Sequence, residues 1–206
     1  MSIVLHHHPY SRAATVVWML EELGQPYTTN WLAWGPQGNK SPEFLAVNPM
    51  GKVPTIRHDG KVVTEAAGIC LYLAEAFPQA GLKPSGAALA DYYRWTFFCS
   101  GPVEQAVTAK ALGWQVPEGR DGMAGFGSFD ATVNALDQFL SGRSYVCGDT
   151  FTAADVYVGS TVDWGLMFKS LPARPSFEAY AERLRGRKAY KSAKAINAAK
   201  TAEMQA

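Results

Sequence analysis

A proline inside a strand pattern is the feature that most restricts how this chain can fold. Residues 53–57 have the composition of a β-strand, but Pro54 has no N–H to donate to a sheet ladder. An ordinary edge-strand proline is one explanation. The other is a cis Val53-Pro54 bond at the start of the strand, which proline tolerates far better than other residues do. That geometry would turn the Val53 main chain outward, where an extended peptide can pair with it like an added strand.

Strand and helix patterns before residue 78 predict an α/β unit. Four segments combine apolar alternation with β-forming residues and are the expected strands: residues 2–7, 27–33, 53–57 and 61–64. Asp59-Gly60 is a hairpin turn signal between the last two. Helices are expected from Ser11, a candidate N-cap, to Gly24, and over residues 65–77. The order is β-α-β and then β-β-α, with residues 34–48 as a loop containing one short helix at most.

Helical periodicity dominates the rest of the chain. Prolines and glycines are concentrated in residues 78–86, which predicts a linker between two domains. Helices are expected at residues 89–110, 129–140, 152–168, 177–185 and 189–202. Thr152 and Asp155 have the spacing of a capping box at the start of the third of these. We therefore expect one domain at residues 1–77 and an all-helical domain at residues 87–206.

Composition excludes several classes of protein. The 206 residues are 48% apolar and 18% charged with a net charge of +1, as in folded globular proteins. The basic residues within 183–200 alternate with alanine, so we interpret them as a solvated helix face and not a nucleic-acid surface. We expect neither a membrane span nor a signal peptide. Cys70, Cys99 and Cys147 are far apart without a C-x-x-C pair, which favours reduced thiols in the cytoplasm.

Three consecutive histidines, His6, His7 and His8, suggest a metal site at first sight. On a strand, however, only His6 and His8 share a face. No Cys, Asp or Glu stands nearby in the sequence to complete a tetrahedral ligand set. We therefore predict no metal at these residues.

A charged corner is predicted where the second helix follows the hairpin, at Thr64, Glu65 and Ala66. Free N–H groups at a helix start bind anions, and Glu65 in the first turn can receive an ammonium group. An amino-acid end carries both charges, so this corner fits a γ-glutamyl group. The simpler alternative is that Glu65 only stabilises the helix dipole, by some 0.3–1 kcal/mol.

Residues 48–56 and 65–77 resemble the glutathione-binding half of the cytosolic glutathione transferases. Residues 9–26 are similar to the first helix of many bacterial members, and residues 152–155 resemble the family's capping box. The resemblance covers nearly all of the chain. It implies a thioredoxin-like N-terminal domain with a mixed four-stranded sheet, followed by an all-α domain, in a homodimer.

The resemblance also implies how glutathione is bound. The Val53 main chain would pair with its cysteinyl part, with Pro54 in the cis form. Glu65 and Ala66 would hold the γ-glutamyl end. Many members have Ser where this chain has Ala66, so here only the backbone N–H can serve. Lys52 would approach the glycine carboxylate.

Gln37 and Asn39, in the preceding loop, are weaker candidates for the same carboxylate.

The thiol must be stabilised as thiolate, and in this family the donor lies after the first strand or at the start of the first helix. Ser11 is our first choice and Tyr10 the second. Arg12 could add positive potential. Because no cysteine occupies this region, a mixed-disulfide mechanism is not expected.

The second substrate, a small apolar electrophile, would lie against aromatic side chains of the helical domain: Trp95, Phe98 and Trp164, with Cys99 and Phe168 beside them. The alternative is that these residues belong to the core. The resulting hypothesis is a detoxifying glutathione transferase. A non-catalytic glutathione-binding or scaffold protein of the same fold, and a glutathione-dependent peroxidase or isomerase, remain as alternatives.

Overall fold

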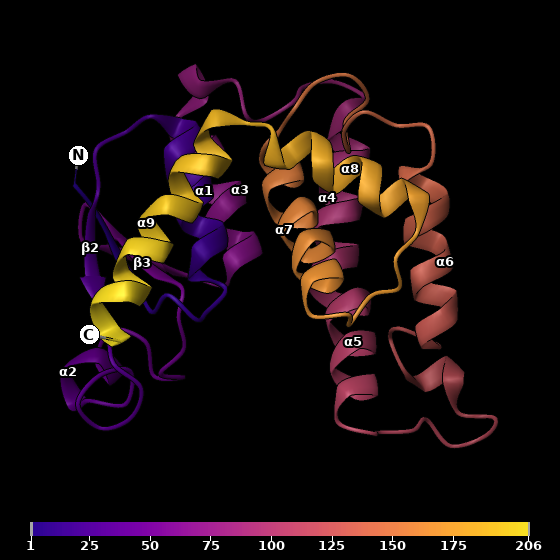
Figure 1. Ribbon diagram of the computed structural model, residues 1–206, viewed down its shortest axis with the longest axis horizontal. Coiled ribbons are helices and arrows are strands. Elements are labelled where there is room, and N and C mark those ends of the chain that lie inside the picture. The colour runs from indigo at the N-terminus through magenta and orange to yellow at the C-terminus, as the bar shows by residue number, and fades with distance from the viewer. Residues whose placement is uncertain (1, 206) are drawn as a thin grey trace. The chain divides into compact units, whose positions relative to one another are not determined.

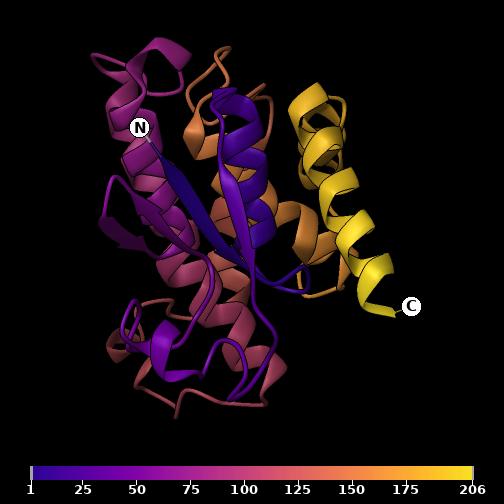
Figure 2. The ribbon, with the colours of Figure 1, turned by 90° about the vertical axis from the view of Figure 1, so that its left-hand side faces the viewer.

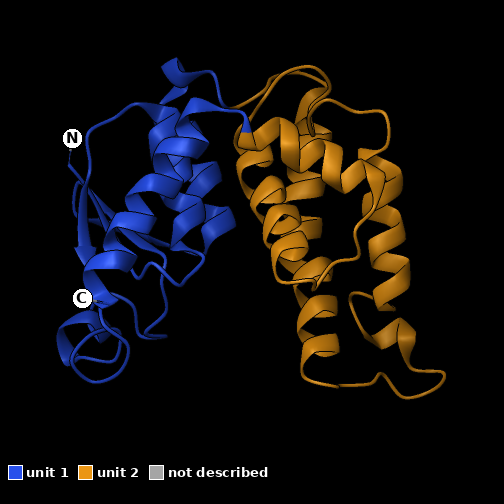
Figure 3. Cartoon of the chain, in the orientation of Figure 1, with its two compact units in different colours: residues 1–82, 186–206 blue, residues 83–185 orange. Residues whose placement is uncertain are grey.

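The chain folds into two compact units, seen here in a computed structural model that describes residues 2–205. Unit 1 consists of Met1–Leu82 together with Gly186–Ala206, and unit 2 of Lys83–Arg185 (Figure 3). The sequence predicted domains at 1–77 and 87–206, with a linker at 78–86. The division therefore differs at the C-terminus, because the last helix belongs to unit 1.

Unit 1 contains a four-stranded mixed sheet, as expected (Figure 1). Its strands are β1 (Ile3–His7), β2 (Thr28–Trp31), β3 (Thr55–His58) and β4 (Lys61–Thr64). They are ordered β2-β1-β3-β4, with β1 parallel to β2 and β3 antiparallel to both of its neighbours. The sheet and its helices have the thioredoxin-like order predicted from the sequence.

Two helices supply most of the apolar core of unit 1. They are α1 (Ala13–Leu23) and α3 (Ala66–Ala76), which pack against each other, while the short α2 (Pro42–Leu45) lies in the loop before β3. Val16 and Leu20 of α1 and Leu73 of α3 are completely buried. Gly24 ends α1 in the left-handed conformation with its N–H on the Leu20 carbonyl, as predicted. The start differs, because α1 begins at Ala13.

The C-terminal helix α9 (Lys188–Gln205) packs along α1, as Figures 1 and 2 show. Arg187, just before α9, forms two hydrogen bonds of 2.6 and 2.8 Å with the Glu22 carboxylate. Ser192 Oγ donates to Glu21 at 2.6 Å. The basic segment at 183–200 is thus not simply a solvated face, because one side of α9 pairs with the acidic end of α1.

Unit 2 is all-helical. Its main helices are α4 (Ala88–Phe98), α5 (Glu104–Ala111), α6 (Phe129–Leu140), α7 (Ala153–Met167) and α8 (Pro175–Arg185). The helix expected at 89–110 is divided into α4 and α5 by a π-helical segment, Cys99–Val103. Pro102 lies in this segment and has no N–H for the regular ladder, which accounts for the interruption. Short 3-10 helices occur at Pro78–Ala80 and Asp121–Met123. Among residues 2–205, no helix has the length and apolar character needed to span a membrane.

Asp155 is the polar centre of unit 2 and confirms the predicted capping box with Thr152. Its carboxylate accepts hydrogen bonds from the Thr152 N–H at 2.8 Å and from the Thr152 hydroxyl at 3.0 Å. It also accepts from the Val146 N–H at 2.7 Å and from the Tyr180 hydroxyl at 2.8 Å. Burial raises the pKa of Asp155 to about 6, and the four donors oppose that rise. The side chain joins α7 and α8 to the loop before α7.

We predict that Asp155→Ala lowers the free energy of unfolding by about 3 kcal/mol, because buried donors from three segments lose their acceptor together. Urea unfolding followed by circular dichroism measures this loss. Asp149→Ala, which removes an exposed carboxylate from the same loop, is the matched control and should change stability by no more than about 0.5 kcal/mol. Equal losses in the two variants would contradict the structural role of Asp155.

Candidate functional site

The register of the sheet brings the predicted site residues to one edge. His6 of β1 lies opposite Thr55 of β3, and Thr55 lies opposite Thr64 of β4. The segments that follow β1, precede β3 and follow β4 therefore all leave the sheet at the same edge. Residues 8–12, residues 53–54 and residues 65–66 are placed together at this edge of unit 1.

The Val53-Pro54 peptide bond is cis, as the proline inside the strand pattern suggested. Pro54 is buried and Val53 is half-buried. Within the described part of the chain, the Val53 main chain makes no hydrogen bond. Its N–H and C=O are therefore available to an extended peptide, which can pair with them as a further strand.

Asn48 fixes the loop that leads to Val53. Its Nδ2 donates to the Lys52 carbonyl and to Thr55 Oγ1, both at 3.0 Å. Its Oδ1 accepts from the Met50 N–H at 3.1 Å. A single buried amide thus holds three points of a segment that has no regular structure. Asn48 lies within residues 48–56, which resemble the family, but nothing in the sequence indicates this supporting role.

Asn39 has a supporting role in place of the binding role considered for it. Its Nδ2 donates to the Gly51 carbonyl at 2.8 Å and its Oδ1 accepts from the Gly35 N–H at 2.8 Å. The side chain is buried, so its amide is already occupied. Lys52, in contrast, is exposed, and none of the described carboxylates lies within ion-pair distance of it.

Glu65 has an unusual backbone for a residue with a side chain. It precedes α3 with φ +64° and ψ 116°, outside the regions that such residues normally occupy. Backbone strain of this kind is concentrated at binding and catalytic sites. The Glu65 carboxylate is exposed and has no partner among residues 2–205. The Ala66 N–H begins α3, where the helix dipole is positive.

Ser11 is buried just before α1, and its hydroxyl is engaged on both sides. Oγ donates to the His8 carbonyl at 2.6 Å and accepts from the Ala13 N–H at 3.1 Å. Arg12 occupies the formal N-cap position, so the predicted cap is displaced by one residue, although Ser11 still satisfies a first-turn N–H. To act as a donor to a thiolate, the Ser11 hydroxyl must turn its proton away from His8.

Tyr10, the second candidate donor, is 57% exposed. Its hydroxyl oxygen accepts from Gln205 Nε2 at 2.8 Å, which leaves its proton free to donate. The contact joins the last turn of α9 to the loop before α1. Gln205 could not be identified from the sequence, because nothing in the residues around it indicates a partner so far away in the chain.

The histidines next to Ser11 are neutral and structural. His8 stacks on Trp34 with ring centroids 4.0 Å apart, and its Nδ1 accepts from the Tyr10 N–H at 3.2 Å. Burial lowers the pKa of His8 and of His6. Among residues 2–205 there is no group of three or more His, Cys, Asp or Glu side chains that could hold a metal ion.

His7 connects the centre of the sheet to α9. The Asn197 Nδ2 donates to the Ala193 carbonyl at 2.9 Å, so Asn197 Oδ1 faces His7 and accepts from its Nε2 at 2.6 Å. The His7 side chain is completely buried, and burial lowers its pKa to about 4. The neutral Nε2–H tautomer is therefore the form that ties α9 to β1 at neutral pH.

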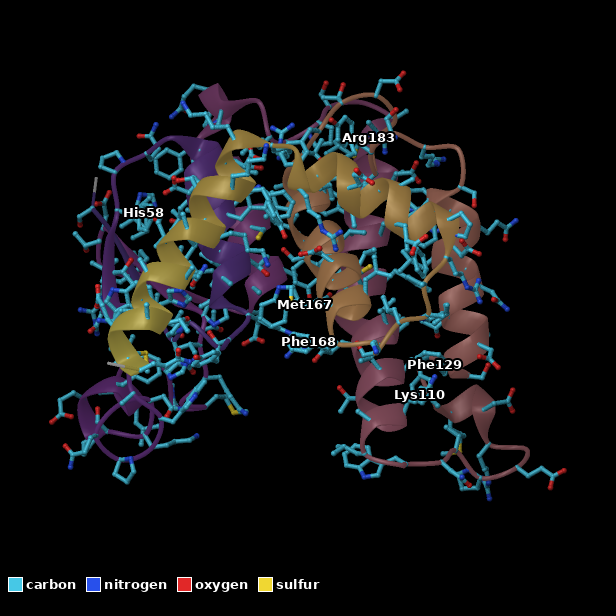
Figure 4. The ribbon with its side chains drawn as sticks, in the orientation of Figure 1. His58, Lys110, Phe129, Met167, Phe168 and Arg183 are labelled. Atoms are coloured by element: carbon cyan, nitrogen blue, oxygen red, sulfur yellow. The ribbon has the colours of Figure 1, made fainter. Side chains whose placement is uncertain are left out.

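The second-substrate residues lie in unit 2, and the structure separates them. Trp95 is buried and stacks on Phe139 of α6 with centroids 3.8 Å apart, so it serves the core of this unit. Phe98 lies 5.0 Å from Trp95, edge to face, and is half-buried. Trp164 is half-buried, and its ring centroid lies 5.8 Å from that of Phe168. Phe168, which Figure 4 labels, is exposed. Phe98 and Trp164 keep surface that a substrate could use.

The sheet order and the cis proline before β3 define a thioredoxin-like domain, which is followed by a helical unit. Comparison with known proteins shows which family this chain is similar to. The family described as "Glutathione S-transferase, N-terminal domain" matches residues 9–76. The N-terminal part of the chain is therefore similar to the N-terminal domain of glutathione S-transferases.

Individual proteins of the same description are also similar to this chain. The chain is 33% identical to glutathione S-transferase GST-4.5 of Xanthomonas campestris pv. campestris, over 61% of this chain and 65% of that protein. It is similar in structure to a glutathione transferase from Methylococcus capsulatus, with TM-score 0.78, 25% identity and coverage of 95% and 98% of the two chains. A theta class glutathione S-transferase from Xanthomonas axonopodis pv. citri, solved with glutathione bound, gives TM-score 0.70 at 26% identity, covering 93% of this chain and 96% of that one.

We predict that acid weakens unit 1 through His7. The pKa of His7 is lowered in the folded protein, so the unfolded chain binds a proton that the folded chain excludes between about pH 6.5 and pH 4. Stability is therefore complete above this window and falls as the pH decreases through it, by up to about 3 kcal/mol. His7→Gln should flatten the pH dependence of the free energy of unfolding in this range, whatever its stability at pH 7. If the free energy of unfolding depended on pH equally in the variant and in the parent protein, the role given to His7 would be refuted.

Proposed function

We propose that this protein is a glutathione transferase that activates the thiol of glutathione for attack on a small apolar electrophile. The observation that carries the proposal is the unpaired Val53 main chain at the same sheet edge as Glu65 and the start of α3. An extended tripeptide needs main-chain partners in its middle and charged partners at its ends. This edge offers both.

Each end of glutathione has a candidate partner. The Glu65 carboxylate is suited to the ammonium of the γ-glutamyl group, and the Ala66 N–H at the start of α3 to its carboxylate. The Lys52 ammonium is suited to the glycine carboxylate. The main chain of Val53, next to Pro54, would pair with the cysteinyl residue. Ala66 has no hydroxyl to add a second contact, so its N–H has to serve alone.

The chemistry requires a thiolate, because a free thiol near pKa 8.5 is mostly protonated at neutral pH. Ser11 remains the first choice of donor. In the free protein the Ser11 hydroxyl donates a hydrogen bond to the neutral His8 carbonyl. A hydrogen bond to a thiolate is charge-assisted and roughly twice as strong. Turning the hydroxyl from the His8 carbonyl to the sulfur is therefore favourable. The start of α1 adds the positive end of a helix dipole at the same place.

The reaction that follows is a displacement at carbon. The thiolate sulfur donates an electron pair to the electrophilic carbon and a C–S bond forms. In a displacement, the bond to the leaving group breaks and that group departs with its electron pair. Phe98 and Trp164 of unit 2 are the residues that we propose to contact an apolar second substrate, with Trp95 supporting Phe98 from the core.

Titrating glutathione by calorimetry and then assaying 1-chloro-2,4-dinitrobenzene tests the proposed function. We expect binding and turnover in the parent protein. Glu65→Gln should weaken glutathione binding about tenfold through loss of the ammonium partner, and Glu118→Gln, an exposed acidic residue of unit 2, should have no effect. Binding without turnover on several electrophiles would favour the scaffold alternative. Turnover of hydroperoxides alone would favour a peroxidase, and no binding at all would overturn the proposal.

We predict that Ser11→Ala raises the pKa of the bound thiol by about one unit or more, because each unit corresponds to about 1.36 kcal/mol of preference for the thiolate. Ultraviolet absorbance of the thiolate, followed against pH with glutathione bound, measures the shift. Tyr10→Phe is the matched control and should leave that pKa unchanged. The opposite pattern would transfer the donor role to Tyr10.

A homodimer is also proposed from the family resemblance, and analytical sedimentation tests it. Cys70, Cys99 and Cys147 are free thiols, which supports a location in the reducing cytoplasm.

A further inference from the structure

We propose that Trp34 is a positioning residue for the thiol chemistry, because it holds His8 in place and, through His8, the hydroxyl of Ser11. The inference rests on the proposed function, since it concerns the donor that would stabilise the thiolate of glutathione. Trp34 lies in the loop after β2, and His8 and Ser11 lie in the loop after β1. The parallel pairing of β1 with β2 brings these two loops to the same edge of the sheet.

The His8 carbonyl sets the resting position of the Ser11 hydroxyl, whose Oγ donates to it at 2.6 Å. The next residue is Pro9, which has no N–H. The peptide group that carries this carbonyl therefore has no donor of its own to fix its direction. Its orientation depends on the packing of the side chains around it, and the His8 ring is one of them.

Two aromatic rings lie against the His8 ring. Trp34 stacks on it with centroids 4.0 Å apart and an interplanar angle of 26°, and the Tyr10 ring centroid lies 5.7 Å away. His8 Nδ1 accepts from the Tyr10 N–H at 3.2 Å, so the neutral ring carries its proton on Nε2. His8 is 2% exposed and Trp34 is 52% exposed. Removing the indole would open a face of the His8 ring to water, which competes for Nδ1 and releases the ring.

The backbone on both sides of Trp34 is fixed by Asn39. The Asn39 N–H donates to the Ala33 carbonyl at 2.9 Å, and its Oδ1 accepts from the Gly35 N–H at 2.8 Å. The Asn39 Nδ2 donates to the Gly51 carbonyl at 2.8 Å, in the segment that leads to the proposed peptide-binding edge. A functional group keeps a productive geometry when the residues that support it are themselves held in this way.

Core packing does not account for the indole at this place. Trp34 leaves about half of its surface in water, and the ring that it covers is polar. Its position on His8 instead protects a hydrogen-bond acceptor beside the proposed thiol donor. The competing explanation is direct contact between the exposed face of the indole and glutathione. The two explanations differ in their consequences, because a contact residue changes the affinity for glutathione and a positioning residue changes the pKa of the bound thiol.

The experiment uses the full chain with glutathione bound. The pKa of the bound thiol is measured from the ultraviolet absorbance of the thiolate, and the dissociation constant of glutathione by calorimetry. The variants are Trp34→Ala, Trp34→Phe, Ser11→Ala and the double variant of Trp34→Ala with Ser11→Ala. Trp114→Ala, which removes a 67% exposed tryptophan from unit 2, is the matched control. Circular dichroism of each variant establishes that it is folded.

We expect Trp34→Ala to raise the pKa of the bound thiol by about half a unit, which is about a threefold change in the ionisation constant. Trp34→Phe keeps a ring on His8 and should restore most of the parent value. In the Ser11→Ala background, Trp34→Ala should add nothing, because its effect passes through the Ser11 hydroxyl. Trp114→Ala should leave the pKa unchanged.

The positioning role is overturned if Trp34→Ala leaves the thiol pKa unchanged, and weaker binding of glutathione with an unchanged pKa would make Trp34 a contact residue. It is also overturned if Trp34→Ala raises the pKa equally with and without Ser11. In these cases the parent protein still binds glutathione and Ser11→Ala still shifts the pKa, so the proposed function stands. Absence of glutathione binding in the parent protein would overturn the proposed function and the role of Trp34 together.

Discussion

The antiparallel pairing of β3 with both of its neighbours is the constraint on which the site depends. It brings the end of β1, the start of β3 and the end of β4 to one edge, so residues from three distant parts of the sequence meet there. Leu5 and Ile56 lie opposite each other in this ladder, and both are completely buried. A shift in register by one residue would turn one of these side chains to the wrong face of the sheet. The hydrophobic core therefore holds the geometry of the binding edge in place.

Features with a local physical cause could be predicted from the sequence. Asp59 and Gly60 form the predicted hairpin turn, and both have positive φ, which these two residue types adopt more readily than most. The cis bond before Pro54 follows from a residue that cannot donate to a ladder, and the capping box from the spacing of Thr152 and Asp155. In each case the signal lies within a few residues of the feature that it predicts.

Features whose partners are far away in the sequence could not be predicted in the same way. An arginine in a basic, alanine-rich segment looks the same whether it faces water or, as Arg187 does, a carboxylate 165 residues away in the chain. The last helix was therefore assigned to the wrong unit. The position of Trp95 in its helix is compatible with a core residue and with a ligand-contacting residue. The stacking of its ring on Phe139 favours the core. The supporting role of Asn39 depends on the conformation of a loop, and the sequence of this loop has no hydrophobic periodicity that would predict it.

The topology also gives the proposed glutathione-binding edge a preference for negative charge that does not need a cluster of basic residues. Both α1 and α3 begin at the edge where β1 and β4 end, so two helix N-termini are directed to the same region. Each contributes the equivalent of roughly half a positive charge. Glutathione carries two carboxylates and one ammonium, and ionising its thiol adds a further negative charge. Much of the stabilisation that such a ligand needs is then supplied by backbone dipoles, which do not depend on side-chain identity. For this reason the lack of a side-chain hydroxyl at Ala66 would leave the electrostatic contribution of the start of α3 to the proposed site in place.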